Sequence, residues 1–205
     1  MKKILPIALC AVLCGCGETT VVDLDNSKEV SAMQNVMELE YRDWTATAEK
    51  MTNSMLASGA FAKVKNPVIA IGEIQNDTMQ RFDTDILIKK IRKTLVNSGR
   101  AQVTTGFRNF KSAEDETTYA VRDTRGNAEY DAATIVGKGT LVAPNMSLTG
   151  KMLQRNLKLK SGWFSSVDTR VEYYLQLTLS DVKTGLSVWE DEQPIVKEGD
   201  HAPTW

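Results

Sequence analysis

The stretch Val171-Glu172-Tyr173-Tyr174-Leu175-Gln176-Leu177-Thr178-Leu179-Ser180 decides the fold of this chain. Every second residue from Val171 to Leu179 is large and mostly apolar, and most residues between them are polar. Because successive side chains of a strand point to opposite faces, this alternation predicts a strand with one face in the core. Lys183-Thr184-Gly185 predicts a tight turn, and a return strand is expected from Leu186 to about Val196.

A hairpin alone is marginally stable in water, so other elements must cover its apolar face. Spacings of three and four predict two amphipathic helices, one ending near Ser58-Gly59 and one running from about Asp83 to Ser98-Gly99. The expected buried stripes are Tyr41, Trp44, Ala48, Met51 and Met55 in the first helix, and Leu87, Ile88, Ile91 and Leu95 in the second.

Further strands are expected at residues 68–74, 100–104 and 146–155, and further helices within 107–119 and 131–136; residues 122–129 are expected to form a loop. The order strand, helix, strand over 68–104 predicts a parallel crossover. The expected fold class is α/β (α+β), with a single domain. Its sheet is mixed and mostly antiparallel, has four to five strands and is flanked by about four helices.

The N-terminus is expected to direct export. Lys2-Lys3 precede an apolar run, Ile4 to Leu13, that is too short to span a bilayer as a helix. Leu13-Cys14-Gly15-Cys16 resembles a bacterial lipoprotein signal, which makes Cys16 the expected lipid attachment site; simple secretion is the alternative. The expected organisation is a signal peptide at 1–15, a flexible tether at 16–38, a globular domain at 39–197 and a polar tail at 198–205.

Processing before Cys16 removes the other two cysteines, so the lipidated chain has no free thiol for disulfides, metal binding or nucleophilic catalysis. It also lowers Lys+Arg from 25 to 23 against 26 Asp+Glu, a net charge of −3. We therefore expect the acyl chains, rather than charge, to hold the protein on the membrane. No basic field indicates nucleic acid as a partner.

Candidate catalytic and metal-binding groups are few. The one histidine, His201, lies in the expected polar tail, which argues against triad chemistry, and the count of histidines and cysteines excludes a metal site built from them. The acidic groups Asp83/Asp85 and Glu114-Asp115-Glu116 are better explained as charges at helix starts than as a metal site. We expect no cofactor, no metal and no enzymatic activity; a cell-wall glycosidase with paired carboxylates remains the third-ranked alternative.

Two features offer surfaces for partners. Trp163-Phe164 lie in a Ser/Gly-rich loop, where they either contact a partner or fold back onto a neighbouring helix. Lys89, Lys90, Arg92 and Lys93 form a basic cluster, which is interpreted as a solvated helix face with binding of an anionic polymer as the alternative. No aromatic residues interleave these charges, as single-stranded nucleic acid would require.

The order and spacing of these motifs resemble the LpoB-type penicillin-binding protein activator lipoproteins from about residue 38 to 197. The residues that carry the resemblance are Cys16, Tyr41-Arg42-Asp43-Trp44, Lys50-Met51, Ser54-Met55-Leu56, Val68-Ile69-Ala70-Ile71, Ile74-Gln75-Asn76-Asp77-Thr78, Ile91-Arg92-Lys93-Thr94-Leu95, Ser98-Gly99, Leu148-Thr149-Gly150, Tyr173 to Asp181, Thr184-Gly185 and Val188-Trp189.

The resemblance implies an outer-membrane lipoprotein facing the periplasm that binds a bifunctional peptidoglycan synthase and activates it, without chemistry of its own. In bacterial lipoproteins, an Asp directly after the lipidated cysteine opposes sorting to the outer membrane. This chain has Gly17 at that position, so by similarity to those proteins we expect it to be sorted to the outer membrane. Members of the family use a long Pro-rich linker, whereas this tether is short and has no proline between Cys16 and Asn66. The rival function is a structural subunit of an envelope or secretion assembly; a large ring in size-exclusion chromatography would favour it, and a monomer would favour the regulator.

Trp163→Ala tests whether the loop aromatic contacts a partner. If it does, the substitution weakens partner binding and leaves the melting temperature unchanged, because an exposed side chain contributes little to folding. Binding and thermal unfolding are measured on the same preparation. A lower melting temperature with unchanged binding would show that Trp163 packs onto its own domain.

Overall fold

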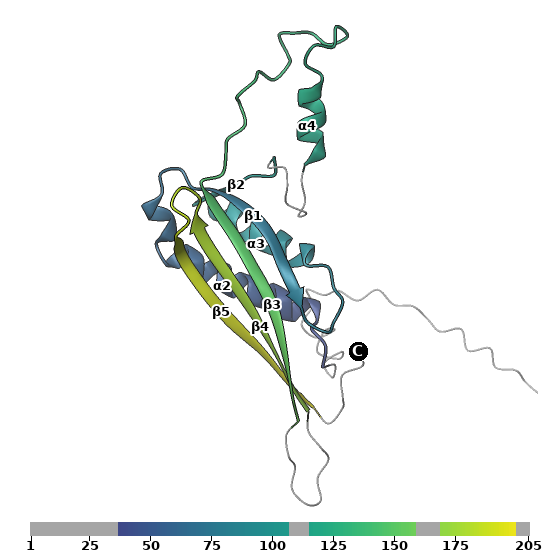
Figure 1. Cartoon of the computed structure of the whole chain (residues 1–205), viewed down its shortest axis with the longest axis vertical. Coiled ribbons are helices and arrows are strands. Elements are labelled where there is room, and N and C mark those ends of the chain that lie inside the picture. The colour runs from purple at the N-terminus through teal and green to yellow at the C-terminus, as the bar shows by residue number, and fades with distance from the viewer. Residues whose placement is uncertain (1–36, 107–114, 159–168, 200–205) are drawn as a thin grey trace, which may run out of the picture. The chain divides into compact units, whose positions relative to one another are not determined.

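The structure is a computed structural model of the 205-residue chain, and it describes residues 37–106, 115–158 and 169–199. All of these belong to one compact unit, Asn35–Trp205. In chain order the elements are α2 (Tyr41–Ala57), a 3-10 helix η1 (Ala60–Lys63), β1 (Val68–Asp77), α3 (Asp85–Ser98), β2 (Gln102–Val103), α4 (Glu116–Asp123), β3 (Met146–Lys158), β4 (Thr169–Asp181) and β5 (Ser187–Gly199). The five strands form one sheet in the order β2-β1-β3-β4-β5 (Figure 1).

The sheet is mixed. β1 runs parallel to β2 and to β3, as the strand-helix-strand order predicts, while β3 to β4 and β4 to β5 are antiparallel. The antiparallel pairs form the long ladders, from Met146↔Asp181 to Lys158↔Thr169 in the first of them. The described residues therefore form an α+β fold with five strands and three α-helices, in rough agreement with the expected class.

β4 buries one of its faces, as its alternation predicts. Its buried side chains are Val171, Tyr173, Leu175, Leu177 and Leu179, each exposed by 1% or less. Fully burying such a side chain stabilises the fold by about 1.5–3 kcal/mol. The turn to β5 contains Gly185 at φ 71°, a left-handed conformation that glycine adopts without steric cost.

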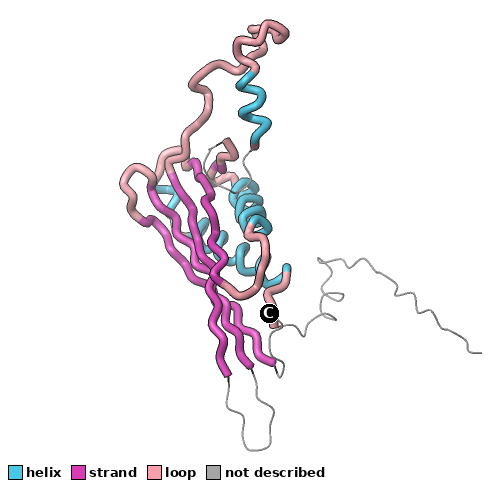
Figure 2. The backbone as a smooth tube through the Cα atoms, turned by 45° about the vertical axis from the view of Figure 1, so that its right-hand side comes forward, coloured by secondary structure: helices cyan, strands magenta, loops and turns pink. Residues whose placement is uncertain are grey.

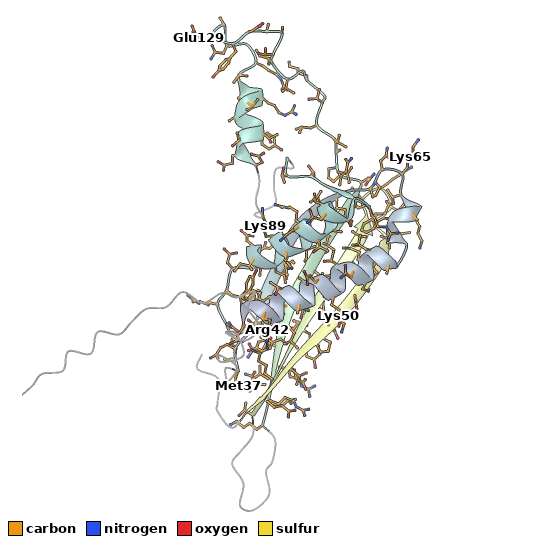
Figure 3. All side chains as sticks on the ribbon, turned by 180° about the vertical axis from the view of Figure 1, so that it is seen from behind. Met37, Arg42, Lys50, Lys65, Lys89 and Glu129 are labelled. Carbon is orange, nitrogen blue, oxygen red and sulfur yellow. The ribbon has the colours of Figure 1, made fainter. Side chains whose placement is uncertain are left out.

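α2 and α3 both cover this buried face, so that the helices lie behind the strands in Figure 1 and in front of them in Figure 3. The predicted stripe of α3 is confirmed, since each of its four residues is exposed by 2% or less. In α2 the prediction holds from Trp44 to Met55 but is wrong for Tyr41, which is 41% exposed. Tyr41 lies in the first turn, where it lines a groove beside α3 instead of the core.

Two local predictions were wrong between β2 and β3. The helix α4 ends at Asp123, four residues beyond the predicted end at Tyr119 and inside the expected loop 122–129; residues 107–114 lie outside the described part. Residues 131–136 form a turn instead of a helix, because Asp131 accepts hydrogen bonds from Ala133 N to its side chain and from Thr134 N to its carbonyl. Such local bonds compete with helix formation, and the β-branched run at 134–136 disfavours a helix further.

The chain enters the domain through a short segment that polar contacts hold in place. Tyr173 Oη donates to Met37 O at 3.1 Å, and the side chain of Gln80 bonds both Leu39 N (2.8 Å) and Leu39 O (3.0 Å). Lys197 Nζ donates to Glu38 O at 2.6 Å and pairs with Asp43 Oδ2 at 2.6 Å. β5 continues past Val196 to Gly199. Its last residues are held to the start of α2 by the contact between Lys197 and Asp43.

β5 is a 13-residue edge strand, which is a potential site for pairing with another chain. Pro194 lies in its middle, opposite Tyr174. Because proline has no N–H to donate, it is accepted in an edge strand where its nitrogen faces away from the neighbouring strand. A strand added to this edge would therefore lack a hydrogen bond at Pro194.

Gly150 in β3 marks a close approach between strands. A Cβ placed there would lie 2.5 Å from Leu177 Cδ2 and 2.6 Å from Gln176 O, and the second of these is a backbone atom that cannot turn aside. Gly150→Ala should therefore lower the free energy of unfolding by about 1–3 kcal/mol, the usual effect of overpacking. Thermal and denaturant unfolding measure the change.

Gly137→Ala is the matched control, because its added Cβ meets only Thr140 Cγ2 at 3.9 Å. Equal stability of the two variants would contradict the close approach at Gly150.

Candidate functional site

The face of β3, β4 and β5 opposite α2 and α3 is open among the described residues; we call it the outer sheet face. It carries the other half of the β4 alternation, beginning with Glu172, Tyr174 and Gln176. Figure 2 shows α2 and α3 on one side of the strands only. A flat strand surface with fixed register is a suitable platform for a partner, because its side chains are already held in place.

An apolar row crosses the middle of the outer sheet face. Leu153 in β3 lies opposite Tyr174 in β4, and Tyr174 lies opposite Pro194 in β5. Val196 follows on the same face of β5 and is 52% exposed. Cross-strand neighbours on one face are in contact range, so these four residues form a continuous apolar strip across three strands.

A charged cluster borders this strip on the side toward the β3–β4 connection. Its centre is Glu172, whose side chain is only 12% exposed. Tyr174 Oη donates to Glu172 Oε2 at 2.7 Å, while Arg155 Nη1 and Arg170 Nη1 each lie 3.9 Å from a Glu172 oxygen. Arg170 also pairs with Glu198 of β5. The cluster thus joins β3 and β4 through the Glu172 carboxylate, and the Arg170–Glu198 pair extends it to β5.

Exposed ion pairs contribute only about 0–1 kcal/mol each to the free energy of unfolding, so the ion pairs of the cluster stabilise the fold little. Glu172 is the exception, because removing the partners of a buried charge is costly. Its hydrogen bond holds the Tyr174 hydroxyl at 2.7 Å, whereas the two arginines lie further away, at 3.9 Å. On the opposite side of the apolar strip, Lys151 pairs with Asp77 at 2.8 Å. Charges of both signs therefore flank an apolar centre.

The hydrogen bond to Glu172 raises the pKa of Tyr174, because a phenol that donates to a carboxylate resists deprotonation; partial burial acts in the same direction. Two carboxyl groups show the opposite effect. The Thr118 hydroxyl holds the pKa of Asp115 below its usual value at the start of α4, and the Thr184 amide does the same for Asp181 in the hairpin turn. Both act as local structural caps.

The predicted site residues Cys16, Trp163 and Phe164 lie outside the described residues. β3 ends at Lys158 and β4 begins at Thr169, so the segment that contains Trp163-Phe164 leaves from and returns to the end of the outer sheet face that carries the charged cluster. The contribution of both aromatics to binding stays a prediction.

The acidic groups considered as metal ligands have structural roles where the structure describes them. Asp83 Oδ1 accepts from Asp85 N at 2.9 Å, and Asp115 accepts from Thr118 N at 3.3 Å, so both stabilise helix starts. In the described ranges 37–106, 115–158 and 169–199, no three His, Cys, Asp or Glu residues converge as a metal site. No helix in these ranges is long and apolar enough to cross a membrane.

The alternation predicted that Glu172 lies on the face of β4 opposite the core, but it did not predict the contact with Tyr174 or the cluster around Glu172. The signal available was a Glu and a Tyr two residues apart in a strand, which share a face. Arg155 is 17 positions from Glu172 in the sequence. It lies beside Glu172 only because the β3–β4 register places the two residues opposite each other.

Glu172→Gln tests the central hydrogen bond of the cluster. The substitution should lower the pKa of Tyr174 toward the ordinary tyrosine value, because an amide opposes phenolate formation less than a carboxylate does. Below the unfolded-state pKa of about 10 the raised pKa stabilises the fold, and this contribution is lost as the pH rises through the folded-state pKa. Ultraviolet titration of phenolate, with Tyr174→Phe subtracted, measures the shift.

Glu198→Gln is the matched control, since Glu198 lies on the same face and bonds Arg170 instead of Tyr174. An unchanged Tyr174 pKa in Glu172→Gln would show that the bond does not form in solution.

The solved structures that match this chain include two LpoB C-terminal domains. The domain from Salmonella enterica matches with 15% identity over 75% of this chain and 98% of that chain, at a TM-score of 0.43. The domain from Escherichia coli matches with 13% identity over the same shares, at a TM-score of 0.41. The lipoprotein GNA1162 from Neisseria meningitidis matches with 10% identity over 67% of this chain and 88% of that chain, at 0.34. A comparison with curated proteins gives no significant match.

A family model supplies the assignment. The model described as "Peptidoglycan-synthase activator LpoB" matches residues 43–195, which runs from the first turn of α2 into β5 and includes the whole sheet up to Ile195. The match spans well over half of the chain and all the residues of the charged cluster except Glu198. The chain therefore belongs to the LpoB family of peptidoglycan-synthase activators.

Proposed function

We propose that this protein is an outer-membrane lipoprotein, anchored through Cys16, that binds a bifunctional penicillin-binding protein through its outer sheet face and activates it. The family match over residues 43–195 is the observation that carries the proposal. It supports a role as an activator; the partner, the contact surface and the location are the proposed parts.

The outer sheet face has the composition of a protein interface. Interfaces typically have an apolar centre with a polar rim and are enriched in Tyr and Arg. The strip Leu153, Tyr174, Pro194 and Val196 supplies the centre, and the cluster with Arg155 supplies part of the rim. Because Glu172 holds the Tyr174 side chain before binding, ordering Tyr174 at an interface would cost less side-chain entropy.

Activation then follows from differential affinity and needs no chemistry by this chain. A ligand shifts a conformational equilibrium only to the extent that it binds one state more tightly. Favouring the active state of the synthase tenfold requires about 1.4 kcal/mol of extra binding free energy for that state. A few well-packed contacts on the apolar strip would provide that amount.

Lipidation at Cys16 would keep the domain close to the membrane, and the tether would set how far it reaches. About 22 residues span at most roughly 75 Å when fully extended. The domain end of the tether is defined, because Met37 and Leu39 are buried and hydrogen-bonded to Tyr173 and Gln80.

Tyr174→Ala and Val196→Ser test the contact surface. Each should weaken binding to the cognate synthase, by roughly tenfold or more for Tyr174→Ala, because buried aromatic residues dominate interface energetics. The full-length lipoprotein in detergent is titrated into each purified bifunctional synthase of the same organism. Affinity and the rate of glycan polymerisation are measured together.

Lys50→Ala is the control, because Lys50 is exposed on α2 on the opposite side of the sheet (Figure 3). Unchanged stimulation by both outer-face variants would reject this surface while leaving the activator role intact. No stimulation of any synthase by the unaltered protein would reject the proposed function itself.

A further inference from the structure

A groove of about 510 Å³ lies between the first turns of α2 and the first half of α3. α2 contributes Tyr41 and Thr45, and α3 contributes residues from Asp85 to Lys93. The groove is on the helical side of the domain, the side seen in Figure 3, where Lys89 is labelled on α3. It is therefore separated from the outer sheet face by the sheet and the core.

The groove has an apolar surface that the core does not use. Tyr41 is 41% exposed and Ile86 is 48% exposed, although both lie in helices whose other large apolar residues are mostly buried. Each lies in the first turn of its helix, and both line the same hollow. We expected this part of α3 to be a solvated helix face. Such a face does not require exposed apolar residues like Tyr41 and Ile86, which we call the apolar floor of the groove.

The cations around this floor have few partners. Lys90 Nζ pairs with Glu49 of α2 at 2.8 Å, but Lys89, Arg92 and Lys93 form no ion pair with any described residue. The Nε of Arg92 is buried and has no hydrogen-bond partner among the described residues. Asp85, at the start of α3, is the one acidic residue that lines the groove. The groove thus presents excess positive charge.

We propose that this groove docks an acidic, amphipathic segment of a partner protein. The apolar side chains of that segment would lie against Tyr41 and Ile86, and its carboxylates would face Lys89, Arg92 and Lys93. Apolar anchors between two packed helices with complementary charge around them are the usual features of groove recognition of a peptide. A polyanion would use the cations but not the apolar floor.

This inference goes beyond the activation of a synthase and does not depend on it. Because the groove and the outer sheet face lie on opposite sides of the sheet, one domain would bind the synthase and the acidic segment at the same time. The domain would then connect a peptidoglycan synthase to a second protein.

The test uses full-length lipoprotein in detergent and a fluorescent synthetic peptide of about 15 residues, with Leu at helical spacing of three and four and Glu at most other positions. Fluorescence anisotropy measures binding. Lys89→Glu/Lys93→Glu should weaken binding roughly tenfold, because the double variant loses two surface charge pairs with the peptide, each of modest strength. Ile86→Ser should also weaken it, and added salt should weaken binding by the unaltered protein.

Lys50→Glu is the matched control, because it makes the same charge change on α2 outside the groove and should bind the peptide normally. All groove variants should still stimulate the synthase, which separates this inference from the proposed function. A peptide with Gln for Glu should bind weakly, and so should one with Ser for Leu. The proposal would be overturned if either control peptide, or the double variant, bound as tightly as the original pair. It would also be overturned if anionic phosphatidylglycerol vesicles or heparin bound the same residues more tightly than the peptide does.

Discussion

One-sided burial of the sheet is the constraint on which the rest of the structure depends. The apolar half of β4 is covered by α2 and α3, whose own stripes are buried against it, and each such side chain contributes about 1.5–3 kcal/mol when buried. Because the period of a strand is two, burying one half of β4 directs the other half outward. The outer sheet face is thus a direct consequence of how the core forms, and its side chains occupy positions set by the strand ladders.

The two proposed surfaces differ in how they are held. On the outer sheet face, Glu172 connects Arg155, Arg170 and Tyr174 across β3 and β4, so its polar groups are ordered by each other. In the groove, Lys89 and Lys93 are exposed, and neither they nor Arg92 form an ion pair with any described residue. The first arrangement suits a partner recognised by shape, whereas the second suits one recognised by charge. Both surfaces are built on helices and strands of one domain, which keeps their separation constant.

Local pattern was sufficient for the elements that period and capping define. The α3 stripe, the turn at Gly185, the stop at Gly99 and the parallel β1–β2 pair follow from residues close in sequence, and the structure confirms them. Prediction was wrong at 131–136, where the side chain and carbonyl of Asp131 form turn bonds, and at Tyr41, where the stripe of α2 extends past the core. Both errors arise where a periodic pattern competes with an interaction that the pattern does not contain.

The sequence by itself determined the class of fold, the hairpin of β4 and β5 and the resemblance to the family, because alternation, turn glycines and motif order are local properties of the chain. The same alternation directed Glu172 to the face opposite the core. Only the tertiary structure decided that Tyr174 and Arg155 contact Glu172 and that Tyr41 and Ile86 share a groove with Lys89. Arg155 depends on strand register, and the groove depends on how α2 packs against α3. Such contacts join residues far apart in the chain, and the packing of the whole core sets them, so no local pattern reports them.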